Sequence, residues 1–151
     1  MEDTSTRIMQ KLLKHKAYGI DTMVFIYHFE ENQVYTPITN ALFELVESGQ
    51  TRGVTSTLSL MEILVKPKEL GDAAAVEDYK YALLNFPNLT VRSLDAEVAE
   101  KAAEIRARYS IRPPDAIQIA TSLVEKTDAF ITNDLGLKPI NEIEIIIMKE
   151  L

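Results

Sequence analysis

The chain has 151 residues and no cysteine, which excludes disulfides, thiolate metal sites and thiol catalysis. Its 23 acidic residues outnumber 16 lysines and arginines, and a formal net charge of −7 argues against a broad basic surface of the kind that holds duplex DNA. No run approaches the roughly 18 apolar residues that span a bilayer, and the N-terminus lacks a signal-peptide core. We therefore expect one cytoplasmic domain with a sizeable core and no membrane partner.

Helical and strand patterns alternate along the chain. Helices are predicted over residues 4–16, 36–48, 56–66, 72–86, 95–109 and 113–126. Strands are predicted over residues 17–20, 52–55, 89–94, 129–132 and 143–148. Periodicity leaves residues 22–29 open between strand and helix, because nearly every position is apolar.

Capping and helix-breaking residues set several of the expected boundaries. Thr4 or Ser5 is expected to cap the first helix, Gly49 to end the second and Pro67 to end the third. The two prolines at 113–114 open the last helix. Strands that alternate with helices favour right-handed crossovers, so we predict a three-layer α/β/α fold with a central parallel sheet.

Four acids stand just after a predicted strand or in the first turns of a predicted helix: Asp21, Glu62, Asp115 and Asp134. Each has an ordinary structural explanation. Asp21 fits a helix cap, and Glu62 fits a capping box with Ser59. Asp115 suits the positive end of a helix dipole, and Asp134 suits a turn. Because ligands of open α/β sheets bind at the carboxyl ends of the strands, a shared site is the simpler account of all four.

Carboxylates gathered in one site repel one another and need a compensating cation. No lysine or arginine is adjacent to any of the four in the sequence. Oxygen ligands suit Mg²⁺ or Mn²⁺, whereas two histidines and no cysteine argue against zinc. His15 is expected on the surface and His28 in the packing. The acids thus predict a Mg²⁺ or Mn²⁺ site suited to phosphodiester hydrolysis, with mutual repulsion in the metal-free protein.

The stretches GIDTMVFIY, SLMEILV, DAIQIATSL and ITND occur in this order. Together they resemble the motifs of PIN-domain nucleases, particularly the VapC-type toxins of prokaryotic toxin–antitoxin pairs. The resemblance covers residues 17–151 as the PIN-like nuclease domain and leaves 1–16 as an N-terminal helical extension. It implies a parallel sheet of order 3-2-1-4-5.

The resemblance also implies a function, namely a Mg²⁺- or Mn²⁺-dependent endoribonuclease. The residues that match the metal-binding and catalytic acids of the family are Asp21, Glu62, Asp115 and Asp134. The hydroxyl of Thr132 matches a position that supports the last acid. The expected partners are an RNA substrate, a cognate antitoxin that covers the site and a second copy in a homodimer.

Three cations near the predicted site, Arg112, Lys66 and Lys68, are candidate contacts to RNA phosphates, although solvated surface charge is the simpler reading of each. Two other classes stay open. One is a catalytically silent PIN-like module that binds RNA or protein. The other is a Mg²⁺-dependent phosphate-handling protein, such as a receiver domain or a haloacid-dehalogenase phosphatase. Met23 stands where that phosphatase needs a second Asp, and Lys149 comes too late for a receiver.

Overall fold

The computed structural model describes residues 3–151, so the first two residues of the predicted extension lie outside the described part. A five-stranded sheet of order β3-β2-β1-β4-β5 forms the centre of the fold. Its strands are β1 (Ala17–Ile20), β2 (Arg52–Ser56), β3 (Leu89–Arg92), β4 (Ala129–Thr132) and β5 (Glu144–Ile147). Every pairing is parallel, which confirms the predicted fold class and strand order.

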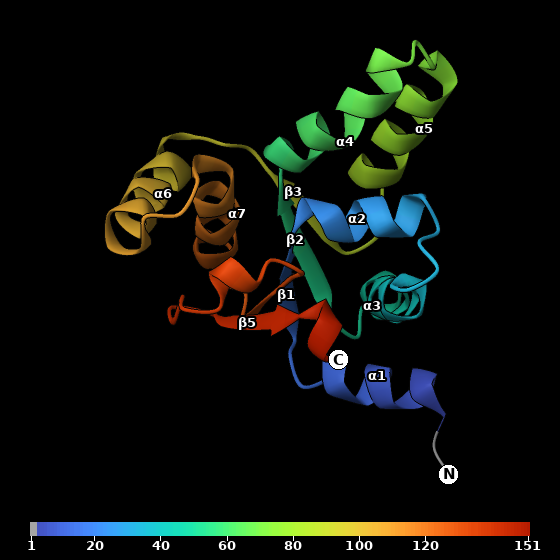
Figure 1. Ribbon diagram of the computed structural model, residues 1–151, viewed down its shortest axis with the longest axis horizontal. Coiled ribbons are helices and arrows are strands. Elements are labelled where there is room, and N and C mark those ends of the chain that lie inside the picture. Colours follow the sequence, from blue (N-terminus) through green and yellow to red (C-terminus); the bar gives the residue numbers. More distant parts are fainter. Residues whose placement is uncertain (1–2) are drawn as a thin grey trace.

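Helices cover both faces of the sheet, and Figure 1 shows α6 and α7 on one side and α2 and α3 on the other. The helices are α1 (Thr4–Leu12), α2 (Thr22–Phe29), α3 (Thr36–Ser48), α4 (Thr57–Glu69), α5 (Ala73–Leu84), α6 (Ala96–Tyr109) and α7 (Pro113–Val124). Two short 3₁₀ turns, η1 (Leu135–Leu137) and η2 (Met148–Glu150), follow β4 and β5. Within residues 3–151 no helix has the length and apolarity needed to cross a membrane.

The sheet buries both faces because its side chains alternate between two apolar clusters. Tyr18 and Ile131 point into the cluster under α1, α2 and α3. Phe130, which precedes Ile131 in β4, points to the other face and packs with Ile105 and Ile119 under α6 and α7. This double burial explains why the predicted strands are continuous apolar runs.

Several boundaries differ from the sequence-based predictions. The cap of α1 is Asp3, which accepts a hydrogen bond from the Thr6 amide at 2.8 Å, rather than Thr4 or Ser5. Residues 22–29 form a helix, because Asp21 caps them and the strand ends there. Pro67 lies inside α4, where the helix has only its final turn left to complete. The third and fifth strands are shorter than expected, since each ends level with its partner strand.

The predicted N-terminal extension is built into the core rather than appended to it. Leu12 is fully buried, and its carbonyl oxygen accepts a hydrogen bond from the Tyr18 hydroxyl at 2.8 Å. His15 is mostly buried, not a surface residue, because its two ring nitrogens lie 2.8 Å from Asp128 and 3.1 Å from Glu144. Asp128 also accepts from the Ala17 amide at 2.9 Å, so the amino end of the sheet holds α1 in place.

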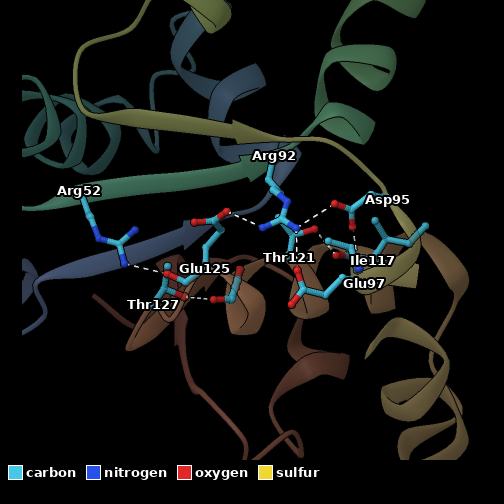
Figure 2. Close-up of polar contacts among 10 residues, drawn as sticks. Arg52, Arg92, Asp95, Glu97, Ile117, Thr121, Glu125 and Thr127 are labelled. Carbon is cyan, nitrogen blue, oxygen red and sulfur yellow. Dashed lines mark hydrogen bonds and ion pairs between the residues drawn. The ribbon is translucent and has the colours of Figure 1, made fainter. Parts of the chain in front are cut away.

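A charged cluster ties the crossover after β3 to α6 and α7. Figure 2 shows Arg92 between three carboxylates, those of Asp95, Glu97 and Glu125, each with an oxygen 2.8 or 2.9 Å from its guanidinium. Arg52 donates to the backbone oxygen of Glu125 at 2.8 Å. Both contacts fix the carboxyl end of α7 against the β2–β3 side of the sheet. Asp115 lies in the first turn of α7, at the opposite end of that helix and beside the carboxyl ends of the strands.

Candidate active site

The structure brings the four predicted acids to one hollow of about 450 Å³. Asp21 follows β1, Glu62 lies in the second turn of α4, Asp115 in the first turn of α7, and Asp134 follows β4. All four therefore lie at the carboxyl edge of the parallel sheet, where open α/β folds bind their ligands. The hollow collects residues from four separate segments of the chain.

Asp21 has both the structural and the electrostatic features of a site residue. Its Oδ1 accepts from the Thr22 amide at 2.8 Å, so it caps α2 as the ordinary explanation predicts. Its Oδ2 accepts from the Thr132 hydroxyl at 2.6 Å. Burial nevertheless raises the pKa of Asp21 to about 6, with a further contribution from the charges of Asp115 and Glu62. The two hydrogen bonds oppose that rise without cancelling it.

Thr132 connects two of the acids. Besides donating to Asp21, its hydroxyl oxygen accepts from the Asp134 amide at 3.1 Å. The Asp134 carboxylate in turn caps η1 by accepting from the Gly136 amide at 2.8 Å. The turn explanation for Asp134 is therefore correct for its Oδ1 oxygen. Thr132 is fully buried, so this arrangement is fixed by the end of β4.

Glu62 is not the capping residue of α4. Ser56 caps that helix through a bond from the Leu58 amide at 3.0 Å, which places Ser59 inside the helix and excludes the predicted capping box. Glu62 instead accepts from the Thr22 hydroxyl at 2.7 Å. This bond joins the first turn of α2 to α4 and holds the carboxylate at the hollow.

A buried polar network lies beneath Glu62. The Gln118 side chain donates from Nε2 to the hydroxyls of Thr22, at 3.1 Å, and Ser59, at 2.7 Å. Thr55 lies 2.8 Å from Ser59 and donates to the Ile20 carbonyl at 3.0 Å. Because the Thr55 hydroxyl donates to the Ile20 carbonyl, its oxygen can accept from the Ser59 hydroxyl. The Thr22 hydroxyl can then donate to Glu62. The network therefore orients the Thr22 hydroxyl as a donor toward Oε1 of Glu62.

Asp115 has a cationic partner that adjacency in the sequence did not reveal. Arg112, one helical turn earlier, lies 3.1 Å from its Oδ2 through Nε. The Arg112 side chain is 75% exposed whereas that of Asp115 is 13% exposed, so the guanidinium covers the carboxylate from the solvent side. The carboxylates nearby, Asp115 first and then Asp134 and Glu62, hold the pKa of Arg112 above its ordinary value. The expectation that a metal alone compensates the acids is thus wrong for Asp115.

The other two candidate cations are placed differently. Lys66 lies one turn beyond Glu62 on α4 and forms an exposed ion pair with Glu30 at 3.2 Å. It lines an adjoining groove that shares Glu62 with the acidic hollow. Lys68 lines a separate hollow between α4 and α5. Of the three, Arg112 is the one that lines the acidic hollow itself.

The donor set has the chemistry for a hard cation but is not already arranged around one. Over residues 3–151, no three His, Asp or Glu side chains stand so that they could hold a metal ion. In this arrangement Arg112 contacts Oδ2 of Asp115, and backbone amides donate to Oδ1 of Asp21 and Oδ1 of Asp134. The pKa of Asp21 is raised mainly by its burial, with smaller contributions from the charges of Asp115 and Glu62.

Sequence reasoning missed several side chains that line or support the hollow. Thr22, Ser59 and Gln118 are polar residues fully or almost fully buried within helices, a placement that only the fold reveals. Asn133 also lines the hollow; its Oδ1 accepts from the Lys149 amide at 3.1 Å. Its Nδ2 is the buried side-chain polar atom within residues 3–151 that has no hydrogen-bond partner. An acceptor from outside the described chain would satisfy it.

The fold and the hollow together define a class: a parallel α/β protein with an acidic site at the carboxyl edge of its sheet. Residues 18–142 match the family model described as PIN domain. The match covers most of the chain, which therefore belongs to the PIN domain family. Among curated protein sequences, none matches the chain.

Solved structures with the same fold come from several bacteria. FitAcB from Neisseria gonorrhoeae aligns with a TM-score of 0.67 and 19% identity, covering 89% of this chain and 99% of that one. A toxin–antitoxin complex from Klebsiella pneumoniae aligns at 0.65 and 20%, covering 87% and 97%. DNA-bound VapBC from Salmonella typhimurium aligns at 0.63 and 21%, covering 88% and 98%. At these identities the likeness establishes the fold.

Proposed function

We propose that the protein is a metal-dependent endoribonuclease that serves as the toxin of a toxin–antitoxin pair. The observation that carries the proposal is the gathering of Asp21, Glu62, Asp115 and Asp134 in one hollow, together with the raised pKa of Asp21. Membership of the PIN domain family and the fold shared with toxin–antitoxin complexes support it.

The four acids would hold Mg²⁺ or Mn²⁺, which when bound supplies an activated water and neutralises charge on the phosphate. The protein's own residues position the rest. Thr22 keeps Glu62 directed at the hollow, and Thr132 holds Asp21 and the start of the Asp134 turn in register. Arg112, released from its ion pair with Asp115, would contact an RNA phosphate.

The strand order separates this function from the receiver alternative. A receiver has a sheet of order 2-1-3-4-5, whereas this sheet has order 3-2-1-4-5. The phosphatase alternative lacks its second acid, since Met23 holds that place. A silent binding module would have no need to keep four carboxylates together against their repulsion. Hydrolysis is therefore the function we favour.

A cleavage assay with two matched variants tests the nuclease. Asp134 and Asp128 flank β4, and six steps along a strand place their Cα atoms up to roughly 20 Å apart. Single-stranded RNA should be cut with Mg²⁺ or Mn²⁺ and left intact in EDTA. Asp134→Asn should lose most of the activity, and Asp128→Asn should keep it. Equal losses of activity in both variants would mean that the proposed location of the site, at the carboxyl end of the sheet, is wrong.

The toxin role and the partners need their own tests. Induced expression of the wild-type chain should arrest bacterial growth, and Asp134→Asn should not. Co-expression with the small protein encoded immediately upstream should restore growth and yield a complex. Size-exclusion chromatography with light scattering should show a homodimer. Growth arrest by both versions would separate toxicity from the acidic hollow.

A further inference from the structure

One face of α2 forms an apolar wall inside the acidic hollow. Met23, Ile26 and Tyr27 all line it, at the i, i+3 and i+4 spacing that places side chains on one face of a helix. Met23 is 42% exposed, a large apolar side chain at the mouth of a site otherwise built from carboxylates. The hollow thus has an acidic side and an apolar side.

The Tyr27 ring is held in a fixed position from behind. It stacks on Tyr35, with ring centroids 4.6 Å apart and planes at 30°. The turn between α2 and α3 braces this pair through Asn32, whose amide donates to the Tyr27 carbonyl at 2.9 Å. The Asn32 side chain accepts from the amides of Val34, at 2.9 Å, and Tyr35, at 3.1 Å. Tyr27 is therefore preorganised before any ligand arrives.

An aromatic ring beside a phosphodiester site matches the chemistry of an unpaired nucleobase. Tyr27 lies six residues after Asp21, about 9 Å along the helix axis, which suits a nucleotide next to the bond that is cut. Bases of single-stranded RNA stack on tyrosine rings whatever their sequence, because every base has a π-face. A paired base in a duplex has both faces occupied by its neighbours and cannot do so.

We propose that Tyr27, backed by Tyr35, is a stacking platform for an unpaired nucleobase beside the scissile phosphate. The inference rests on the proposed nuclease function and specifies single-stranded RNA as its substrate. The competing role for the two rings is packing alone, since both lie against the apolar cluster under α2 and α3.

Abasic substrates separate stacking from packing. A short single-stranded RNA with one cleavage site is prepared with the base removed at each position around that site in turn. For the wild type, one position should show a loss of about 5- to 150-fold in kcat/KM, the range expected for a single base–aromatic stack. Tyr27→Leu should lower cleavage of the intact RNA and abolish the penalty at that position. Tyr27→Phe should keep the penalty, because the ring remains.

A second ring pair supplies the matched control. Tyr79 stacks on Phe29 at 5.1 Å and packs against the same cluster, but it lines the adjoining groove and not the acidic hollow. Tyr79→Leu should keep the full abasic penalty. A penalty that survives in Tyr27→Leu overturns the proposal, and so does a wild-type scan without any position-specific loss. If Tyr27→Leu does not fold, a wild-type scan without a position-specific loss still overturns the proposal, and Tyr27→Ala is used to assign any loss that the scan shows.

Failure of the proposed function gives a different result. If the wild type cuts no RNA, binding of the same oligonucleotides to the protein is measured by fluorescence anisotropy. A weaker affinity for one abasic RNA that Tyr27→Leu no longer distinguishes would support the platform without cleavage. Equal affinities for intact and abasic RNA would overturn it.

Discussion

Replacing Asp21 by Asn should stabilise the metal-free protein near neutral pH. Burial and the nearby acids raise the Asp21 pKa from 3.8 to about 6, and each unit corresponds to about 1.4 kcal/mol against the folded state once the group is ionised. The ceiling is therefore about 3 kcal/mol. Asn remains a good cap and can still accept from the Thr22 amide, but it disturbs the Thr132 hydrogen bond at a cost of about 1 kcal/mol.

The expected net gain is about 1–2 kcal/mol, or about 2–8 °C in Tm for a chain of this size. Thermal unfolding in EDTA at pH 7.5 measures it. Because the folded-state pKa is raised, the destabilisation is present above pH 6 and is relieved as pH falls from 6 toward 3.8. The advantage of Asp21→Asn should therefore shrink by pH 4.5. A lower Tm than wild type at pH 7.5, or a difference that does not change with pH, would refute the reasoning.

Asp115→Asn is the matched control for this experiment. It removes another site carboxylate, but one that is paired with the mostly exposed guanidinium of Arg112, so the change in Tm in EDTA should be smaller than for Asp21→Asn. The repulsion that the sequence predicted for all four acids is thus expected to act mainly at Asp21.

Other substitutions test the supporting contacts. Thr132→Val should raise the pKa of Asp21 further, visible as a shift of its carboxyl titration by NMR, because the hydroxyl donor is lost; an unshifted titration would contradict this. Gln118→Leu should lower cleavage at least tenfold by releasing the hydroxyl that holds Glu62, while Mn²⁺ affinity falls less; unchanged cleavage would leave the network purely structural. Asp128→Ala should lower Tm by about 2–6 °C through lost bonds at the amino end of the sheet while cleavage persists.

The layers and strands of the fold could be predicted from the sequence because the local patterns agree with the overall topology. Alternation of apolar strands with helices opened by Thr36 or by the prolines at 113–114 was enough to predict the layers. Helix boundaries differed where Asp3 caps α1, where α1 ends at Leu12 rather than at residue 16, and where Pro67 fell in a last turn. The four acids could be assigned to one site because the carboxyl ends of parallel strands meet at one edge of a sheet.

The supporting contacts could not be predicted because they join residues far apart in the chain. The bonds from Thr132 to Asp21 and from Gln118 to Ser59 span 111 and 59 positions, and no periodicity encodes them. The sequence makes Arg112 a candidate RNA contact, whereas its pairing with Asp115 depends on the backbone direction where α7 begins. The contacts of Asp128 with His15 and Ala17 likewise depend on where α1 packs.

The central claim is that the acids of the hollow form one metal-dependent hydrolytic centre, and a Mn²⁺ titration tests it most directly. Calorimetric binding and single-turnover cleavage of one single-stranded RNA are measured on the same preparation, for the wild type and for Asp134→Asn. The account predicts that cleavage rises with Mn²⁺ at the concentration where the site fills, and that Asp134→Asn loses most of both. Cleavage that persists in EDTA, or Mn²⁺ binding unchanged in Asp134→Asn, would contradict it.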